Sequence, residues 1–90
     1  MANDLKGSPY KIDTPGVITT DKIFVNQMVW QEPAAAEDDL VVSDANARTL
    51  WDENAYIGGT GVSIEQDINH FCDGITVDTI DSGILFIYFR

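Results

Sequence analysis

The stretch Ile84-Leu85-Phe86-Ile87-Tyr88-Phe89, followed by Arg90, is the strongest structural signal in this chain of 90 residues. The apolar run is too short to favour a helix, and it is rich in the β-branched and aromatic residues that are typical of strands. Side chains alternate between the two faces of a strand, so the even-numbered residues share one face and the odd-numbered residues share the other. An antiparallel sheet usually buries one face only. Because both faces are apolar here, the sequence predicts that both are covered.

Only one of these covers is expected to come from the chain itself. A domain of this length has a modest core, because a short chain buries a smaller share of its surface than a long one. Leaving Phe86 and Tyr88 bare would expose about 300–500 Å² of aromatic surface, which is as large as the largest apolar patch of a typical monomer. We therefore expect a homo-oligomer or another protein partner on the second face.

Composition limits the remaining classes of protein. Fifteen acidic and five basic residues give a net charge of −10, which argues against nucleic acid and anionic membranes as partners. Cys72 is the single cysteine, so no disulfide within the chain is possible. Residues 1–9 are predicted to be a flexible N-terminal arm without the pattern of a signal peptide, and residues 10–90 a single domain.

The rest of the chain contains further short β-rich segments that are separated by turn residues. Seven or eight such strands at a spacing of about ten residues are typical of an all-β fold. We expect an antiparallel β-sandwich that resembles a jelly roll. The expected strands are 10–13, 17–20, 22–30, 40–42, 48–56, 62–66, 75–80 and 84–89.

The connections are less uniform. Asp81-Ser82-Gly83 is predicted to join 75–80 and 84–89 as a hairpin, and residues 32–39 are predicted to form a loop that crosses between sheets. Two interpretations of residues 43–56 remain open. In one, a hairpin turns at Asn46, which takes the left-handed conformation. In the other, Ser43 caps a helix.

No group of residues forms a recognisable catalytic or metal site. His70 and Cys72 lie two residues apart on one face, but no third residue that would orient a base is evident, and two ligands are too few for structural zinc. The Gly58–Gly61 segment lacks the ending of a phosphate-binding loop and is interpreted as mobile. Acidic and amide residues that could contact calcium do not have the EF-hand spacing; they are Glu37, Asp38, Asp39, Asp44 and Asn46. We therefore expect no enzyme activity, no metal and no cofactor.

Several motifs resemble those of small proteins encoded by tailed bacteriophages. They are Thr14–Thr20, a strand that ends in Trp30, the loop Pro33–Ala36, the segment Asp44–Trp51 and the closing segment Gly74–Tyr88. Members of this group often carry Gly where this chain has Ala47. The resemblance covers nearly all of the chain after residue 9, and its motifs are structural rather than chemical.

The resemblance implies a structural virion protein that decorates or cements the capsid, with the major capsid protein or other virion proteins as partners. Such a protein would be made in the host cytoplasm and located in the virion. The predicted interface consists of apolar side chains, namely Leu5, Trp30, Trp51, Phe86 and Tyr88. The alternative is a tail-associated module that binds a glycan or receptor through Trp30 or Trp51, with Tyr56 and Tyr88 as further aromatic candidates.

Overall fold

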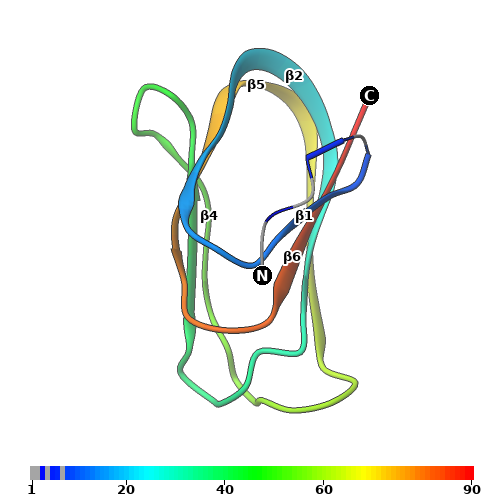
Figure 1. The fold of residues 1–90 in the computed structure, drawn as a ribbon, viewed down its shortest axis with the longest axis vertical. Helices are drawn as coiled ribbons and strands as arrows, with labels where there is room; N and C mark the ends of the chain where they lie inside the picture. Colours follow the sequence, from blue (N-terminus) through cyan, green and yellow to red (C-terminus); the bar gives the residue numbers. More distant parts are fainter. Residues whose placement is uncertain (1–2, 4, 7) are drawn as a thin grey trace.

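The computed structural model describes residues 3, 5–6 and 8–90, and these residues form an all-β fold without a helix. All six strands pair antiparallel in one open sheet, in the order β1-β6-β2-β5-β3-β4 (Figure 1). The antiparallel all-β class expected from the sequence is therefore confirmed. The strands are β1 (Tyr10–Ile12), β2 (Gly16–Gln31), β3 (Asp39–Ser43), β4 (Thr49–Asn54), β5 (Ser63–Ile80) and β6 (Ile84–Phe89).

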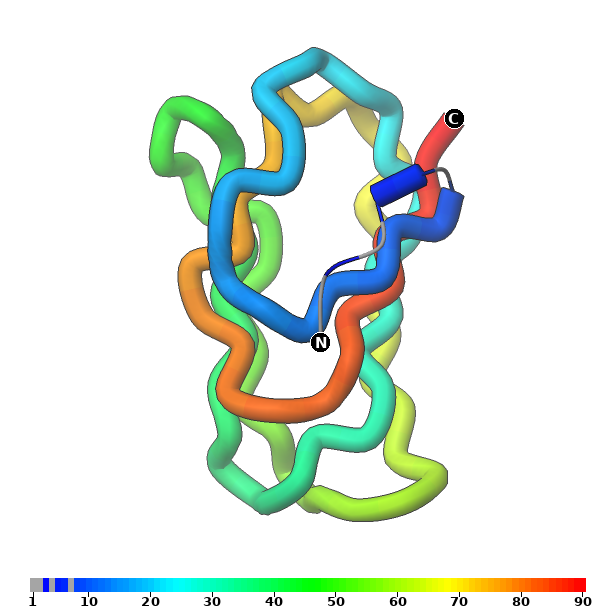
Figure 2. The backbone as a smooth tube through the Cα atoms, in the orientation of Figure 1, coloured from blue at the N-terminus to red at the C-terminus, as the bar shows by residue number. Residues whose placement is uncertain are grey.

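Two long strands, β2 and β5, determine the shape of the molecule. They pair along nearly their whole length, and three register irregularities interrupt the pairing between Val17 and Gln27. Such bulges bend a strand and increase its twist. The β2–β5 ribbon accordingly curves over one end of the molecule (Figures 1 and 2).

The bend divides the sheet into two half-sheets. In the first half-sheet, β1 and β6 extend the sheet beyond the C-terminal part of β2, which pairs with the N-terminal part of β5. In the second, β3 and β4 extend it beyond the C-terminal part of β5, which pairs with the N-terminal part of β2. Both half-sheets contribute to one buried cluster, which contains Trp30 and Leu85 from the first and Leu40 and Trp51 from the second.

The expected number of seven or eight strands is not found, because two pairs of expected strands are continuous. Segments 17–20 and 22–30 both belong to β2, and segments 62–66, from residue 63 onward, and 75–80 both belong to β5. The polar residues between them, such as Asp21 and Asp73, suggested turns but lie within bent strands. The strands also form one sheet, so the two-sheet jelly-roll arrangement is not confirmed.

The predicted hairpin between 75–80 and 84–89 is wrong. β6 pairs with β1 and β2, whereas the C-terminal part of β5 pairs with β2 and β3. Residues 81–83 instead cross from one half-sheet to the other (Figure 2). The indole Nε1 of Trp30 donates a hydrogen bond of 2.8 Å to the Ser82 carbonyl, and this bond holds the crossing against the core. Residues 32–38 also connect the two half-sheets, since they join β2 to β3.

Residues 43–56 adopt the hairpin rather than the helix. Strands β3 and β4 pair from Asp39 and Asn54 to Ser43 and Thr49. The left-handed residue of the turn is Ala47, with φ of 61°, and not Asn46 as expected. The reason is the carboxylate of Asp44, whose Oδ1 accepts hydrogen bonds from the backbone N–H groups of Asn46 and Arg48.

Described residues of the N-terminal arm contact the domain. The Asn3 side chain accepts hydrogen bonds from the N–H groups of Asp13 and Thr14 and donates one to the Thr14 carbonyl. The Ser8 hydroxyl accepts a hydrogen bond from the N–H of Phe89. Within the described part of the chain, no helix has the length and apolar character needed to cross a membrane.

Candidate functional site

The two faces of β6 differ in their burial. Leu85 and Ile87 point into the core and have no exposed surface, while Phe86 is half-buried and Tyr88 is 38% exposed. The chain thus covers one face of β6 completely. The other face forms part of the outer surface of the first half-sheet.

Cross-strand pairing brings further aromatic and basic residues onto this outer surface. Lys11 lies opposite Phe86 on β1, and Phe24 lies opposite Phe71 on the β2–β5 ribbon. The rings of Phe24 and Phe71 meet edge to face, with centroids 5.2 Å apart. Phe71 is 62% exposed. Edge-to-face contact is a favourable geometry for aromatic pairs, because the positive ring edge meets the negative ring face.

Two cations flank this aromatic pair. The guanidinium carbon of Arg90 lies 4.3 Å from the centre of the Phe24 ring, and Nζ of Lys22 lies 5.6 Å from the centre of the Phe71 ring. Both distances are within the range of cation–π attraction. We call this surface the aromatic face; its members are Lys11, Lys22, Phe24, Val29, Phe71, Phe86, Tyr88 and Arg90. Three carboxylates lie on the same side of β5, with Glu65 opposite Val29, Asp67 opposite Gln27 and Asp73 opposite Lys22.

The outer surface of the second half-sheet combines carboxylates with small apolar and hydroxyl side chains. Val41 lies between Asp52 on β4 and Thr79 on β5, and its outward direction follows from the burial of its neighbours Leu40 and Val42. Along the same surface, Val17 lies opposite Thr76 and is 65% exposed. We call this surface the acidic face; its members are Val17, Asp39, Val41, Asp52, Thr76 and Thr79.

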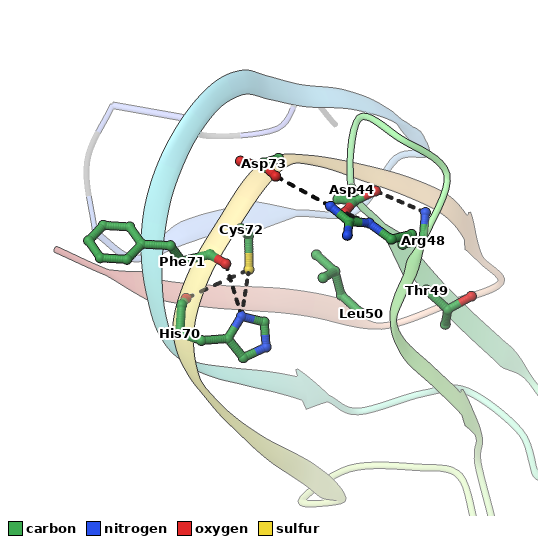
Figure 3. Close-up of a pocket in the computed structure, with 8 residues that line it drawn as sticks. All are labelled: Asp44, Arg48, Thr49, Leu50, His70, Phe71, Cys72 and Asp73. Carbon is green, nitrogen blue, oxygen red and sulfur yellow. Dashed lines mark hydrogen bonds and ion pairs between the residues drawn. The ribbon is translucent and has the colours of Figure 1, made fainter.

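A polar pocket of about 320 Å³ lies where the β3–β4 hairpin approaches the bend of β5 (Figure 3). The backbone N–H of Ala45 donates to the carbonyl of Asp73 and joins the two elements. Phe71 points away from the other lining residues, toward the outer surface (Figure 3). The lining residues are Asp44, Arg48, Thr49, Leu50, His70, Phe71, Cys72 and Asp73.

Arg48 is held between the two carboxylates of the pocket. Its Nε lies 3.0 Å from Asp44 and its terminal nitrogen 3.3 Å from Asp73. The pKa of Asp44 is lowered, first by the hydrogen bond from the Arg48 backbone N–H, and further by the N–H of Asn46 and the Arg48 charge, while burial opposes the shift. Because two carboxylates already neutralise Arg48, the pocket does not offer a free cation to an anionic ligand.

His70 and Cys72 are close together but are not arranged as an activated nucleophile. The Cys72 Sγ lies 3.9 Å from the His70 Nδ1, and that nitrogen also lies 3.0 Å from the carbonyl oxygen of Phe71. A proton on Nδ1 that is donated to this carbonyl leaves no lone pair there to accept the thiol proton. Burial first, and then the charges of Asp44 and Asp73, raise the pKa of the Cys72 thiol. Burial and the two nearby negative charges therefore both favour the unreactive thiol form over the thiolate.

The structure separates the five residues of the predicted interface. Trp30 is completely buried and Trp51 nearly so, and both belong to the core. Phe86 and Tyr88 belong to the aromatic face, and Leu5 is exposed on the N-terminal arm. Phe24 and Phe71 were not predicted as surface residues from the sequence, because they face each other only when β2 and β5 continue through the bend.

Three of the acidic residues considered for calcium, Asp38, Asp39 and Asp44, accept structural hydrogen bonds through their carboxylates. Asp38 accepts from the Ser82 hydroxyl, and Asp39 accepts from the Asn54 side chain. Asp44 is bound as described above. Among the residues that the structure describes, no group of three or more His, Cys, Asp or Glu side chains is placed to hold a metal ion.

Comparisons with known proteins add no relationship to these observations. The aromatic face, the acidic face and the polar pocket are therefore interpreted from their own geometry. No protein-family model, curated protein sequence or solved structure matches this chain.

Proposed function

We propose that this protein is a structural subunit of a tailed-bacteriophage virion, which decorates or cements the capsid by binding neighbouring protein subunits. The single observation that carries the proposal is the outer side of β6. Its inner residues fill the core, while Phe86 and Tyr88 remain partly exposed on the outer surface that also carries Phe24 and Phe71. An exposed cluster of aromatic side chains is typical of protein–protein interfaces, where Tyr, Phe and Arg are enriched. The motifs quoted from the sequence supply the virion context.

The two half-sheets would act as the two layers of a small sandwich in this subunit. Because β2 and β5 each contribute to both layers, every layer contains segments of four strands. Shared strands make the body rigid, and a rigid body can present a fixed surface without paying a large ordering entropy on binding.

Two measurements test the proposal. Mass spectrometry of purified virions should find this chain at a high copy number relative to the major capsid protein. Virions of a phage that lacks the gene should have heads that are less stable to heating than wild-type heads, and addition of the purified protein should restore this stability. Absence of the chain from purified virions would overturn the proposal.

The alternative of a glycan-binding tail module loses the two residues on which it was based. Stacking on a sugar requires an exposed ring face, and Trp30 and Trp51 are in the core. A glycan array is the direct comparison. Specific glycan binding together with only a few copies per virion would favour the tail module over the capsid subunit.

A further inference from the structure

We infer that the N-terminal part of β5 binds an extended basic segment of another protein, which adds a strand to the first half-sheet. Residues 63–68 pair with β2 on one side, and no strand in the described part of the chain pairs with them on the other side. We call this side the free edge. In strand addition, backbone hydrogen bonds supply affinity and side chains supply specificity. The inference goes beyond the proposed function, because it concerns a different surface and does not depend on a virion.

The first argument is the direction of the backbone groups along the free edge. The N–H of Glu32 donates to the carbonyl of Val62, the residue directly opposite. Bonded and non-bonded positions alternate along an antiparallel pair. Ser63, Glu65 and Asp67 are therefore non-bonded positions, and their N–H and C=O groups point away from β2. The Asp67 carbonyl accepts a hydrogen bond from a neighbouring side chain instead of from a strand.

The fold limits the length of the free edge. Asn69 has a positive φ of 53° and lies at a register shift where β5 has one residue more than β2, which is a bulge. Beyond the bulge, the Asp73 carbonyl accepts from the N–H of Ala45, and β3 occupies the edge from Thr76 onward. The added strand is therefore short, about five or six residues, which is a common strand length.

The second argument is that the inward side chains of the free edge lack a complete apolar cover. Ile64 and Ile68 pack against the core cluster but are only half-buried. Alternate side chains of an added strand would point to the same side of the sheet. Apolar residues at these positions would remove the remaining surface of Ile64 and Ile68 from water.

The third argument is the charge of the outward side chains. Glu65 and Asp67 are exposed, and they lie opposite the uncharged Val29 and Gln27 of β2. Neither carboxylate forms an ion pair with any Lys or Arg that the structure describes. Lys22 lies opposite a third carboxylate, beyond the bulge. Opposite charges directly across a sheet are favourable, so the segment that fits alternates between basic and apolar residues.

A second copy of this chain does not supply such a segment. Its five basic residues are Lys6, Lys11, Lys22, Arg48 and Arg90. No two of them occupy alternate positions in the sequence. Antiparallel pairing of two free edges would instead bring the same carboxylates together, and like charges across a sheet are destabilising. Charged edge residues commonly prevent such self-association, so the partner is a different protein.

Fluorescence anisotropy with short capped peptides tests the inference. The probe is a labelled peptide in which Lys and Val alternate. In one control peptide Glu replaces Lys; in the other the Lys backbone nitrogens are methylated, which keeps the charge but removes the hydrogen-bond donors. The wild type should bind the probe and neither control. The bound probe should slow deuterium exchange of the amides of residues 63–67, but not of those of β4 at the opposite end of the sheet.

Protein variants locate the binding site. Glu65→Lys with Asp67→Lys should weaken probe binding at least about tenfold, because two attractive charge pairs become repulsive. Asp21→Lys with Asp52→Lys is the matched control, because it makes the same change in net charge at exposed carboxylates outside the free edge; it should bind as the wild type does. Glu65→Pro removes an N–H that is not bonded to β2, so it should block the added strand and retain the fold. Circular dichroism melting checks the folding of each variant.

Three results would overturn the inference. They are a wild type that does not bind the probe at about 1 mM, equal binding of the methylated peptide, and equal weakening in the two charge variants. The last two would mean that the acidic protein attracts cations without pairing of strands. Absence of the chain from virions would not change peptide binding, so failure of the proposed function is distinguishable from failure of this inference.

Discussion

Ala47 in the β3–β4 turn has a backbone conformation that is unfavourable for a residue with a Cβ atom. Its φ of 61° lies in the left-handed region, which costs an L-residue about 1–2 kcal/mol. Glycine avoids this cost but has a larger unfolded-state entropy. We expect Ala47→Gly to raise the free energy of unfolding by about 0.5–1 kcal/mol, measured by urea denaturation. Ala45→Gly is the control, because Ala45 has no positive φ; it should lower stability. Equal effects of both substitutions would contradict the strain argument.

Asp44 gives the same turn a dependence on pH. Its pKa is below the ordinary value of 3.8, chiefly because of the Arg48 backbone N–H. A lowered folded-state pKa contributes stability above the unfolded value, and this stability is lost as pH falls through the folded value. We expect Asp44→Asn to lower the melting temperature at pH 7 and to reduce its decline below about pH 4. Asp52→Asn is the control, because it removes an exposed carboxylate outside the turn. If the melting temperatures of both variants depend on pH in the same way, Asp44 makes no special contribution to the pH dependence of stability.

At the scale of elements, the connection from β5 to β6 depends on Gly83. Its φ is 76°, and a Cβ there would approach the Gln31 carbonyl and the indole nitrogen of Trp30. Gly83→Ala combines backbone strain with this clash, so we expect a loss of about 2–4 kcal/mol in the free energy of unfolding. Gly61→Ala is the matched control, because Gly61 also has a positive φ but its Cβ would meet open space. It should cost only about 1 kcal/mol. Similar losses would show that strain alone matters.

The directions of side chains along the strands could be predicted from the sequence, but the pairing partners of the strands could not. Alternation predicted β6 and the direction of its side chains, because a period of two is local. The partner of β6 was predicted wrongly. The sequence of residues 81–83 is compatible with a hairpin turn, but in the structure these residues cross between the half-sheets, and β6 pairs with β1 and β2. The bends of β2 and β5 were interpreted as turns, because polar residues within a bent strand have the same composition as a turn. As a result, Phe86 and Tyr88 were recognised as surface candidates, but Phe24 and Phe71, which complete the face, were not.

For the whole molecule, the net charge of −10 on 90 residues implies repulsion within the folded state. We expect added sodium chloride to raise the melting temperature of the protein by several degrees, about 1 kcal/mol in stability. A further variant with Glu65→Gln and Asp52→Asn, two exposed carboxylates, should respond less to salt. A melting temperature that is independent of salt in both proteins would mean that the repulsion is already balanced by local pairing.

The sharing of β2 and β5 between the two half-sheets has a mechanical consequence. Both half-sheets depend on β2 and β5, so the loss of either long strand would remove hydrogen-bond partners from both. The molecule should lose its structure in one step, and amides on β3 and on β6 should exchange with deuterium through the same global opening. Mechanical load applied at one end of the molecule would then be carried by the whole body, as the proposed capsid role would require.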